Sequence, residues 1–145
     1  MELVEHITRA WGWSGIRPTE VIGQNDFGNL MVKDEDGRYW RISPEDLYCR
    51  LVANDRAEFD VVVRSQAFLQ DWYMAPLAVQ ALERLGPLEH HQKYCFKIPG
   101  VLGGEYGGSN LAKITLSQLI EASGHIARQV AELPDGTQVK LLVTE

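Results

Sequence analysis

Residues 26–42 read DFGNLMVKDEDGRYWRI and decide the fold of this chain. Two short runs of mostly apolar residues flank an Asp-Gly pair, which is the pattern of a β-hairpin. A two-residue loop at 36–37 would mix polar and apolar side chains on one face. A three-residue loop at 35–37, with Gly37 left-handed, instead gathers Leu30, Val32, Trp40 and Ile42 on one face. Because burial favours that register, we predict the three-residue loop, with Met31, Lys33, Tyr39 and Arg41 pointing the other way.

The segments on either side of the hairpin predict an α+β fold. Apolar spacing predicts helices over 3–11, from 55 to 85 with a break at Pro76, and from 115 onward, where a capping box opens the helix. Ser43-Pro44-Glu45-Asp46 has the cap, proline and acids of a helix start. Strands are expected at 19–23, 49–53, 94–98, 111–114 and 137–143, with a turn at 133–136. Because helices and strands do not alternate regularly, we predict a mostly antiparallel sheet packed against several helices, in a single domain over 1–145.

Composition narrows the class of protein. The 145 residues are 45% apolar and 23% charged, which is ordinary for a globular chain. No apolar run approaches the roughly 20 residues of a membrane span, so no membrane partner is expected. The first residues lack the basic start and apolar stretch of a secretory signal, which predicts a cytoplasmic protein. Two cysteines, Cys49 and Cys95, are too few for a disulfide scaffold or a thiolate zinc site.

The charge balance points away from nucleic acid. The chain carries 14 Lys and Arg against 20 Asp and Glu, a net charge of −6. Nucleic-acid binding relies on basic side chains that displace counterions, so we predict no nucleic-acid partner. Residues 1–60 hold twelve acids and seven bases, which is most of the excess. This asymmetry is consistent with a solvated acidic face, which charge alone favours, or with a surface that steers a basic partner.

No motif in the chain demands catalysis, a metal or a cofactor. Residues 100–110 contain five glycines, but they lack the Gly-Lys-Ser/Thr ending of a phosphate-binding loop, contain no basic residue and include Glu105. Backbone geometry is therefore the favoured explanation, with Tyr106 packing and Asn110 hydrogen-bonding the loop. His90 and His91 are adjacent, so on an extended chain they point to opposite sides and do not share a metal ion.

A protein partner is the remaining expectation. The acidic hairpin tip and the acids that follow it offer a surface for a basic partner, and Trp13 follows the first helix as a possible anchor. The alternatives are an ordinary solvated turn for the acids and a core-capping role for the tryptophan. The predicted partner-binding residues are Asp34, Glu35, Asp36, Glu45, Asp46, Trp13 and Glu105.

Several motifs, taken in order, resemble a known family. They lie at 25–29, 37–41 with Pro44-Glu45, 102–106 with Asn110, 124–127 with Gln129, and 133–136. The combination resembles the type VI secretion immunity domain that neutralises DNase effectors, found behind a GAD-like region in two-part immunity proteins. The motif residues expected to form the fold are Phe27, Gly28, Trp40, Gly103, Gly104, Tyr106, Asn110, Pro134 and Gly136.

The resemblance implies a stoichiometric inhibitor rather than an enzyme. It would bind a cognate toxin, a nuclease, in the cytoplasm and block the toxin's active site or substrate path. An acidic inhibitor suits this role because a nuclease must present positive charge to DNA. We expect a monomer or weak dimer when the chain is free. The alternative is a small-molecule or nucleotide-sensing module that uses the glycine-rich loop at 100–110.

Overall fold

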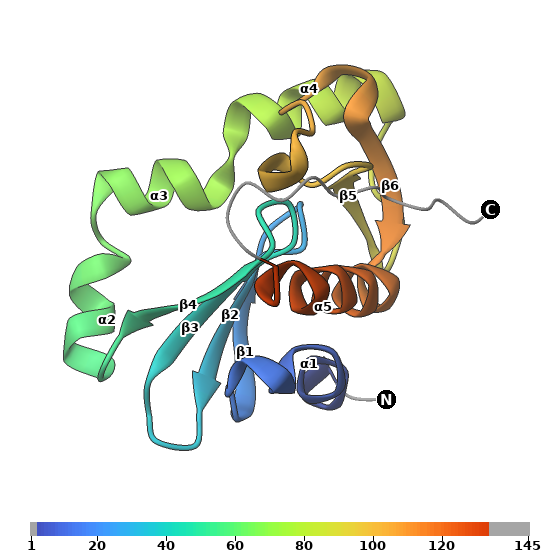
Figure 1. Ribbon diagram of the computed structural model, residues 1–145. Coiled ribbons are helices and arrows are strands. Elements are labelled where there is room, and N and C mark those ends of the chain that lie inside the picture. Colours follow the sequence, from blue (N-terminus) through green and yellow to red (C-terminus); the bar gives the residue numbers. More distant parts are fainter. Residues whose placement is uncertain (1–2, 134–145) are drawn as a thin grey trace.

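The predicted hairpin forms the centre of a four-stranded antiparallel sheet in the order β1-β2-β3-β4 (Figure 1). The computed structural model describes residues 3–133 of the chain. The strands are β1 (Pro18–Gln24), β2 (Leu30–Asp34), β3 (Tyr39–Ser43) and β4 (Tyr48–Ala53). Val32 pairs with Trp40, and Gly37 is left-handed with a φ of 79°. The predicted three-residue loop and its register are therefore confirmed.

The predicted helix start at 43–46 is wrong. Residues 44–47 instead form the turn that joins β3 to β4. The N–H of Leu47 donates to the carbonyl of Pro44 at 3.4 Å, and Leu47 has a positive φ of 54°. Pro44 is the first residue of this turn, and the φ that proline fixes is compatible with a turn as well as with the first turn of a helix. Pairing of the flanking strands decides between the two.

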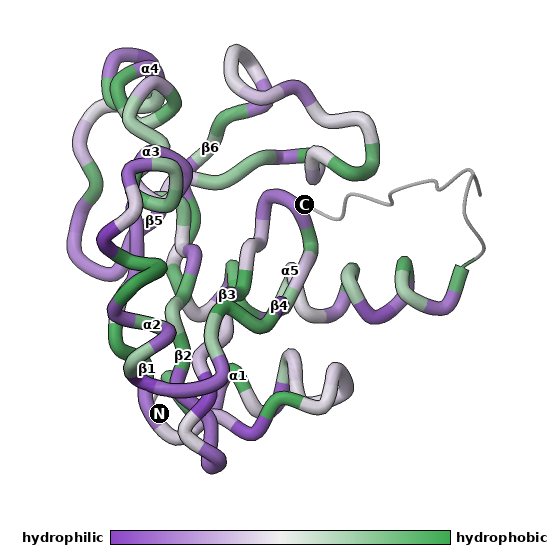
Figure 2. The backbone as a smooth tube through the Cα atoms, turned by 90° about the vertical axis from the view of Figure 1, so that its left-hand side faces the viewer, coloured by the Kyte–Doolittle hydropathy of each residue, from purple (hydrophilic) through white to green (hydrophobic). Residues whose placement is uncertain are grey.

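Two helices cover one face of the sheet, namely α1 (Leu3–Trp11) and α5 (Leu116–Ala131) (Figure 1). They pack on the apolar face of the hairpin in a core that contains Ile7, Trp11, Leu30, Val32, Ile42 and Ile120. The predicted helix start at Thr115 is confirmed, because Thr115 Oγ1 accepts the N–H of Gln118 at 3.4 Å, while the Gln118 side chain accepts from the Thr115 hydroxyl at 2.9 Å and not from its backbone N–H. Figure 2 shows hydrophilic and hydrophobic stretches alternating along α5, as expected of a helix with one buried face.

Helices α1 and α5 approach each other closely at Gly124. A Cβ built on this glycine would lie 2.3 Å from the carbonyl oxygen of Ala10. The indole N–H of Trp13 donates to the carbonyls of Ala10 and Gly124, at 3.0 and 3.2 Å. Trp13 belongs to the short 3-10 helix Gly12–Ser14 and therefore links the end of α1 to α5.

The chain after β4 forms three helices rather than one helix with a single break. They are α2 (Arg56–Val62), α3 (Gln66–Tyr73) and α4 (Ala75–Leu85). Ser65 begins α3 by accepting the N–H of Phe68 at 3.2 Å, and Met74, with a φ of 50°, separates α3 from α4. These helices help to cover the second face of the sheet, where Tyr39 stacks on Phe59 with 4.1 Å between ring centroids. Met31, Tyr39 and Arg41 of the hairpin are therefore buried on that face.

A two-stranded antiparallel sheet, β5 (Gln92–Phe96) and β6 (Leu111–Thr115), completes the fold and confirms the α+β class. A second core contains Phe27, Ala81, Tyr94, Phe96 and Leu111. The glycine-rich loop joins the two strands and contains the 3-10 helices Gly100–Leu102 and Gly108–Asn110.

The predicted strand at 137–143 and motif residues Pro134 and Gly136 lie outside the described residues. Within residues 3–133, none of the helices combines the length and apolar character that crossing a bilayer requires.

Candidate partner-binding site

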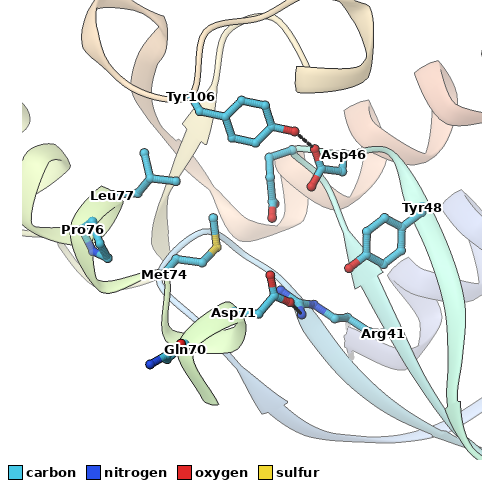
Figure 3. A pocket seen from close by; sticks show the side chains of 10 residues that line it. Arg41, Asp46, Tyr48, Gln70, Asp71, Met74, Pro76, Leu77 and Tyr106 are labelled. Carbon is cyan, nitrogen blue, oxygen red and sulfur yellow. Dashed lines mark hydrogen bonds and ion pairs between the residues drawn. The ribbon is translucent and has the colours of Figure 1, made fainter. Parts of the chain in front are cut away.

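A pocket of about 340 Å³ opens where three parts of the chain meet (Figure 3). These parts are the β3–β4 turn, the junction of α3 with α4, and the glycine-rich loop. The pocket is lined by Arg41, Glu45, Asp46, Tyr48, Gln70, Asp71, Met74, Pro76, Leu77 and Tyr106. Figure 3 shows Met74, Pro76 and Leu77 on the side opposite Tyr48. The volume is within the range in which proteins hold small groups, on the order of 300–1,000 Å³.

A buried asparagine organises the floor of this pocket. Asn29 has no exposed surface. Its amide nitrogen donates to both carboxylate oxygens of Glu45, at 3.0 and 2.8 Å, and its amide oxygen accepts from Arg41 Nε at 2.9 Å. Asn29 therefore lies between an acid and a base and forms hydrogen bonds with both.

Arg41 is fixed on its other side by α3. Its guanidinium pairs with Asp71, whose side chain is 68% exposed. The guanidinium also lies over the ring of Trp72, with 5.2 Å between the Arg41 Cζ atom and the ring centroid. A planar guanidinium can combine such an ion pair with stacking, which a lysine ammonium cannot do. The guanidinium of Arg41 is thereby used in contacts within the chain.

Glu45 is a buried carboxylate without a cation of its own. It is 5% exposed, and none of the ion pairs among residues 3–133 includes it. Burial raises the pKa of Glu45, although hydrogen bonds from its own backbone N–H, from Asn29 and from Ser43 oppose this change. Water is the better solvent for a charge, so an unpaired buried carboxylate costs free energy.

We expect Glu45→Gln to raise the melting temperature at neutral pH. The raised pKa means that the folded chain holds the proton more tightly than the unfolded chain, so this stabilisation is complete below the ordinary value of 4.5 and is lost as pH rises through the folded pKa. Glutamine does not ionise and can still accept from Asn29. Thermal unfolding at neutral pH and below pH 4.5 should show a gain only at neutral pH. A lower melting temperature at neutral pH would contradict this assignment.

Tyr106 and Asp46 close the pocket from the glycine-rich loop (Figure 3). The phenol O–H of Tyr106 donates to the carboxylate of Asp46. This hydrogen bond, together with burial, raises the pKa of Tyr106 to about 12. Tyr106 is nevertheless 52% exposed, so its ring is available to a binding partner.

The predicted acidic hairpin tip divides into a buried acid and two exposed ones. Asp34 is 4% exposed and accepts from the backbone N–H groups of Asp36 and Arg38, the Arg38 side chain and the indole of Trp40. Burial raises the pKa of Asp34, but these hydrogen bonds outweigh it and hold the pKa below its usual value. Asp34 therefore builds the hairpin. Glu35 and Asp36 remain exposed at its tip.

The other predicted contacts lie apart from the hairpin tip. Glu105 is exposed on the glycine-rich loop, and Asp46 lines the pocket. Trp13 is 36% exposed, but its indole N–H is used between α1 and α5. The structure thus brings only Glu45 and Asp46 of the predicted set into the pocket, with Glu105 next to Tyr106 in the chain.

The glycine-rich loop folds on an asparagine and not around an anion. Asn110 donates to the carbonyls of Ile98 and Glu105, at 2.9 and 2.7 Å, and accepts the N–H of Ile98 at 2.8 Å. A Cβ built on Gly104 would lie 1.8 Å from the carbonyl oxygen of Ile98. These contacts explain why the loop has an asparagine at 110 and a glycine at 104.

The remaining motif residues are structural in position. Phe27 belongs to the second core, and Trp40 donates its indole N–H to Asp34 at 2.8 Å. Gly28 has a φ of 71°, and Gly103 a φ of 92°, both in the left-handed region that favours glycine.

Neither cysteine has the environment of a nucleophile. Burial raises the pKa of both Cys49 and Cys95 to about 11. The thiolate is the reactive form, so both thiols are expected to react slowly with a disulfide reagent at mildly alkaline pH. When the chain is unfolded in denaturant, the same reagent should react rapidly with both thiols. Rapid reaction of either thiol in the native chain would contradict the burial.

Nothing in the described part of the chain resembles a metal centre. No group of three or more His, Cys, Asp or Glu side chains between residues 3 and 133 is placed to hold an ion. The expectation that His90 and His91 point to opposite sides is wrong, because they lie in a turn where His91 has a positive φ of 66° and their ring centroids are 3.7 Å apart. Both line a separate surface hollow.

Sequence reasoning missed the basic and polar half of the pocket. Asn29 and Arg41 were placed in the hairpin but not in a site, and Asp71 was one acid within a predicted helix. Only the docking of α3 on the sheet brings Asp71 to Arg41, across 30 residues of chain. The one available signal was an arginine in a strand otherwise built of residues with high β-propensity.

Comparison with known proteins defines the class of this chain. Residues 53–127, just over half of it, match the family described as T6SS immunity protein Tdi1, C-terminal. The chain therefore belongs to this family of type VI secretion immunity proteins, and the predicted resemblance is confirmed. Immunity proteins act by binding, which also confirms the prediction that the chain is not an enzyme.

A solved structure supports the fold. The crystal structure of Atu4351 from Agrobacterium tumefaciens matches with a TM-score of 0.54 and 15% sequence identity. The match covers 83% of this chain and 61% of that chain, so this chain spans about three fifths of the solved protein. No curated protein sequence matches this chain.

Proposed function

We propose that this chain neutralises a toxin of a type VI secretion system by binding it and covering its active site or substrate path. Membership of the immunity family over residues 53–127 carries the proposal. An immunity protein must recognise its toxin directly. The pocket and the exposed acids around it are the surface of this chain best suited to that task.

We propose further that the toxin is a nuclease that acts in the cytoplasm. The net charge of −6 supports this, because a nuclease presents basic side chains to its polyanionic substrate. An acidic inhibitor competes for that surface and associates faster through electrostatic steering. Glu105 is exposed, and none of the ion pairs among residues 3–133 includes it, so it contributes to such a field. Glu35 and Asp36 are also exposed, but they pair with Arg17 and Arg38.

Co-expression with the product of a neighbouring toxin gene tests the proposal. We expect this chain to restore growth to cells that produce the toxin, and the two proteins to purify as a stoichiometric complex. The purified toxin should degrade DNA, and this chain should stop it. Full toxicity in the presence of excess chain would overturn the immunity role. A neutralised toxin that does not degrade DNA would overturn only the nuclease assignment.

A further inference from the structure

The pocket between the β3–β4 turn and α3–α4 has an unbalanced charge. Three carboxylates line it, those of Glu45, Asp46 and Asp71, and Arg41 is the one basic side chain in the lining. Arg41 is already bonded to Asn29 and Asp71. The pocket therefore holds more negative charge than its own cation can balance.

One of the negative charges in the pocket, that of Glu45, belongs to a buried side chain and not to an exposed one. Its two carboxylate oxygens accept from the amide nitrogen of Asn29, at 3.0 and 2.8 Å, and its own backbone N–H and the Ser43 hydroxyl also stabilise the charge, but none of these donors is a cation. The side chain is 5% exposed and lines the cavity. A cation that entered the cavity would compensate a charge that is now buried without an ionic partner.

The side chains that line the pocket favour a cation with an aliphatic stem and a planar charged head. Met74, Pro76 and Leu77 form an apolar side, and the ring of Tyr106 is half exposed at the rim (Figure 3). A long aliphatic stem can lie against such a wall while its charged head reaches the acids. The acids come from both the turn and α3, so a planar head with five donors fits them better than a compact ammonium.

We propose that this pocket receives an arginine side chain of the toxin. The proposal rests on the proposed function, because that function supplies a partner with a basic surface. The stem of the arginine packs against Met74 and Leu77, and its guanidinium meets Glu45 and Asp46 beside the ring of Tyr106. A few residues dominate the binding energy of most protein interfaces. Arginine is common among them, and such residues are typically enclosed in well-packed pockets.

Affinity for the co-purified toxin tests the pocket. We expect Glu45→Gln and Asp46→Asn each to weaken binding about 30-fold, the change that corresponds to a typical interface hot spot of about 2 kcal/mol. Glu83→Gln, which removes the same charge from an exposed position on α4, should change affinity by less than about twofold, as expected of a peripheral charge. Melting temperatures show whether each variant is folded.

The outcomes separate the pocket from the proposed function. If the wild-type chain binds the toxin and both pocket variants bind it equally well, the pocket proposal is wrong and the immunity role stands. If the wild-type chain does not bind the toxin, the proposed function fails, and the pocket proposal fails with it. N-acetyl-arginine amide provides a second readout. At millimolar concentration it should shift the NMR signals of Tyr106 and Asp46, whereas the citrulline analogue should not. Equal shifts with both compounds would also overturn the proposal.

Discussion

Replacing Gly124 by alanine is expected to destabilise the fold by about 2–3 kcal/mol, the usual cost of overpacking a tight contact. In an ordinary helix the same change stabilises by about 1 kcal/mol, because glycine is a poor helix former. Here the added Cβ would lie 2.3 Å from the carbonyl oxygen of Ala10, which is backbone and cannot rotate away. Helix α5 must therefore move from α1, which also weakens the hydrogen bond from Trp13 to Gly124.

Urea unfolding of Gly124→Ala beside Gln129→Ala measures this effect. Gln129 is exposed on the same helix, so its replacement should change stability by less than about 0.5 kcal/mol. A Gly124→Ala variant at least as stable as the wild type would show that the two helices do not pack as closely as described.

Asn29→Leu is expected to cost about 3 kcal/mol or more, because it leaves two buried charged groups without their shared partner. Leucine is similar in size to asparagine but neither donates to Glu45 nor accepts from Arg41. Asn29 has no exposed surface, so water does not replace the lost hydrogen bonds directly. The side chains of Glu45 and Arg41, which line the pocket, would also lose the hydrogen bonds that hold them in position.

The matched control for this change is Asn54→Leu. Asn54 is exposed and makes only long hydrogen bonds to Glu58, at 3.4 and 3.5 Å. Denaturant unfolding should show little change for Asn54→Leu and a large loss for Asn29→Leu. Similar losses in both variants would mean that Asn29 does not organise the network.

Local parts of the fold could be predicted from the sequence because neighbouring residues decide them. The hairpin register follows from alternation within residues 30–42, and the start of α5 follows from Thr115 and Gln118. The prediction of a helix start at residues 43–46 is wrong for a related reason. A serine, a proline and two acids satisfy the local rules of both a helix start and a turn, so only the strand pairing beyond them distinguishes the two.

The site could be predicted less well because it depends on contacts between distant segments. Burial of Tyr39 and Arg41 requires α2 and α3, which contribute Phe59, Asp71 and Trp72. Asp34 and Glu45 look like surface acids in the sequence, and nothing adjacent to them shows that tertiary structure encloses both. Asp46 is predicted only as one acid of a partner-binding surface, and nothing adjacent to it in the sequence indicates the pocket that it lines.

The two separate cores have a consequence for how the chain opens in solution. One core joins α1, the sheet and α5, and the smaller one joins Phe27 and α4 to β5 and β6. Such units can unfold as distinct cooperative parts with different free energies. Amide hydrogens of Tyr94 and Phe96 should therefore exchange with deuterium before those of Val32 and Ile42. A ligand that spans both units would slow the faster group most, so exchange protection reports on occupancy without a mutation.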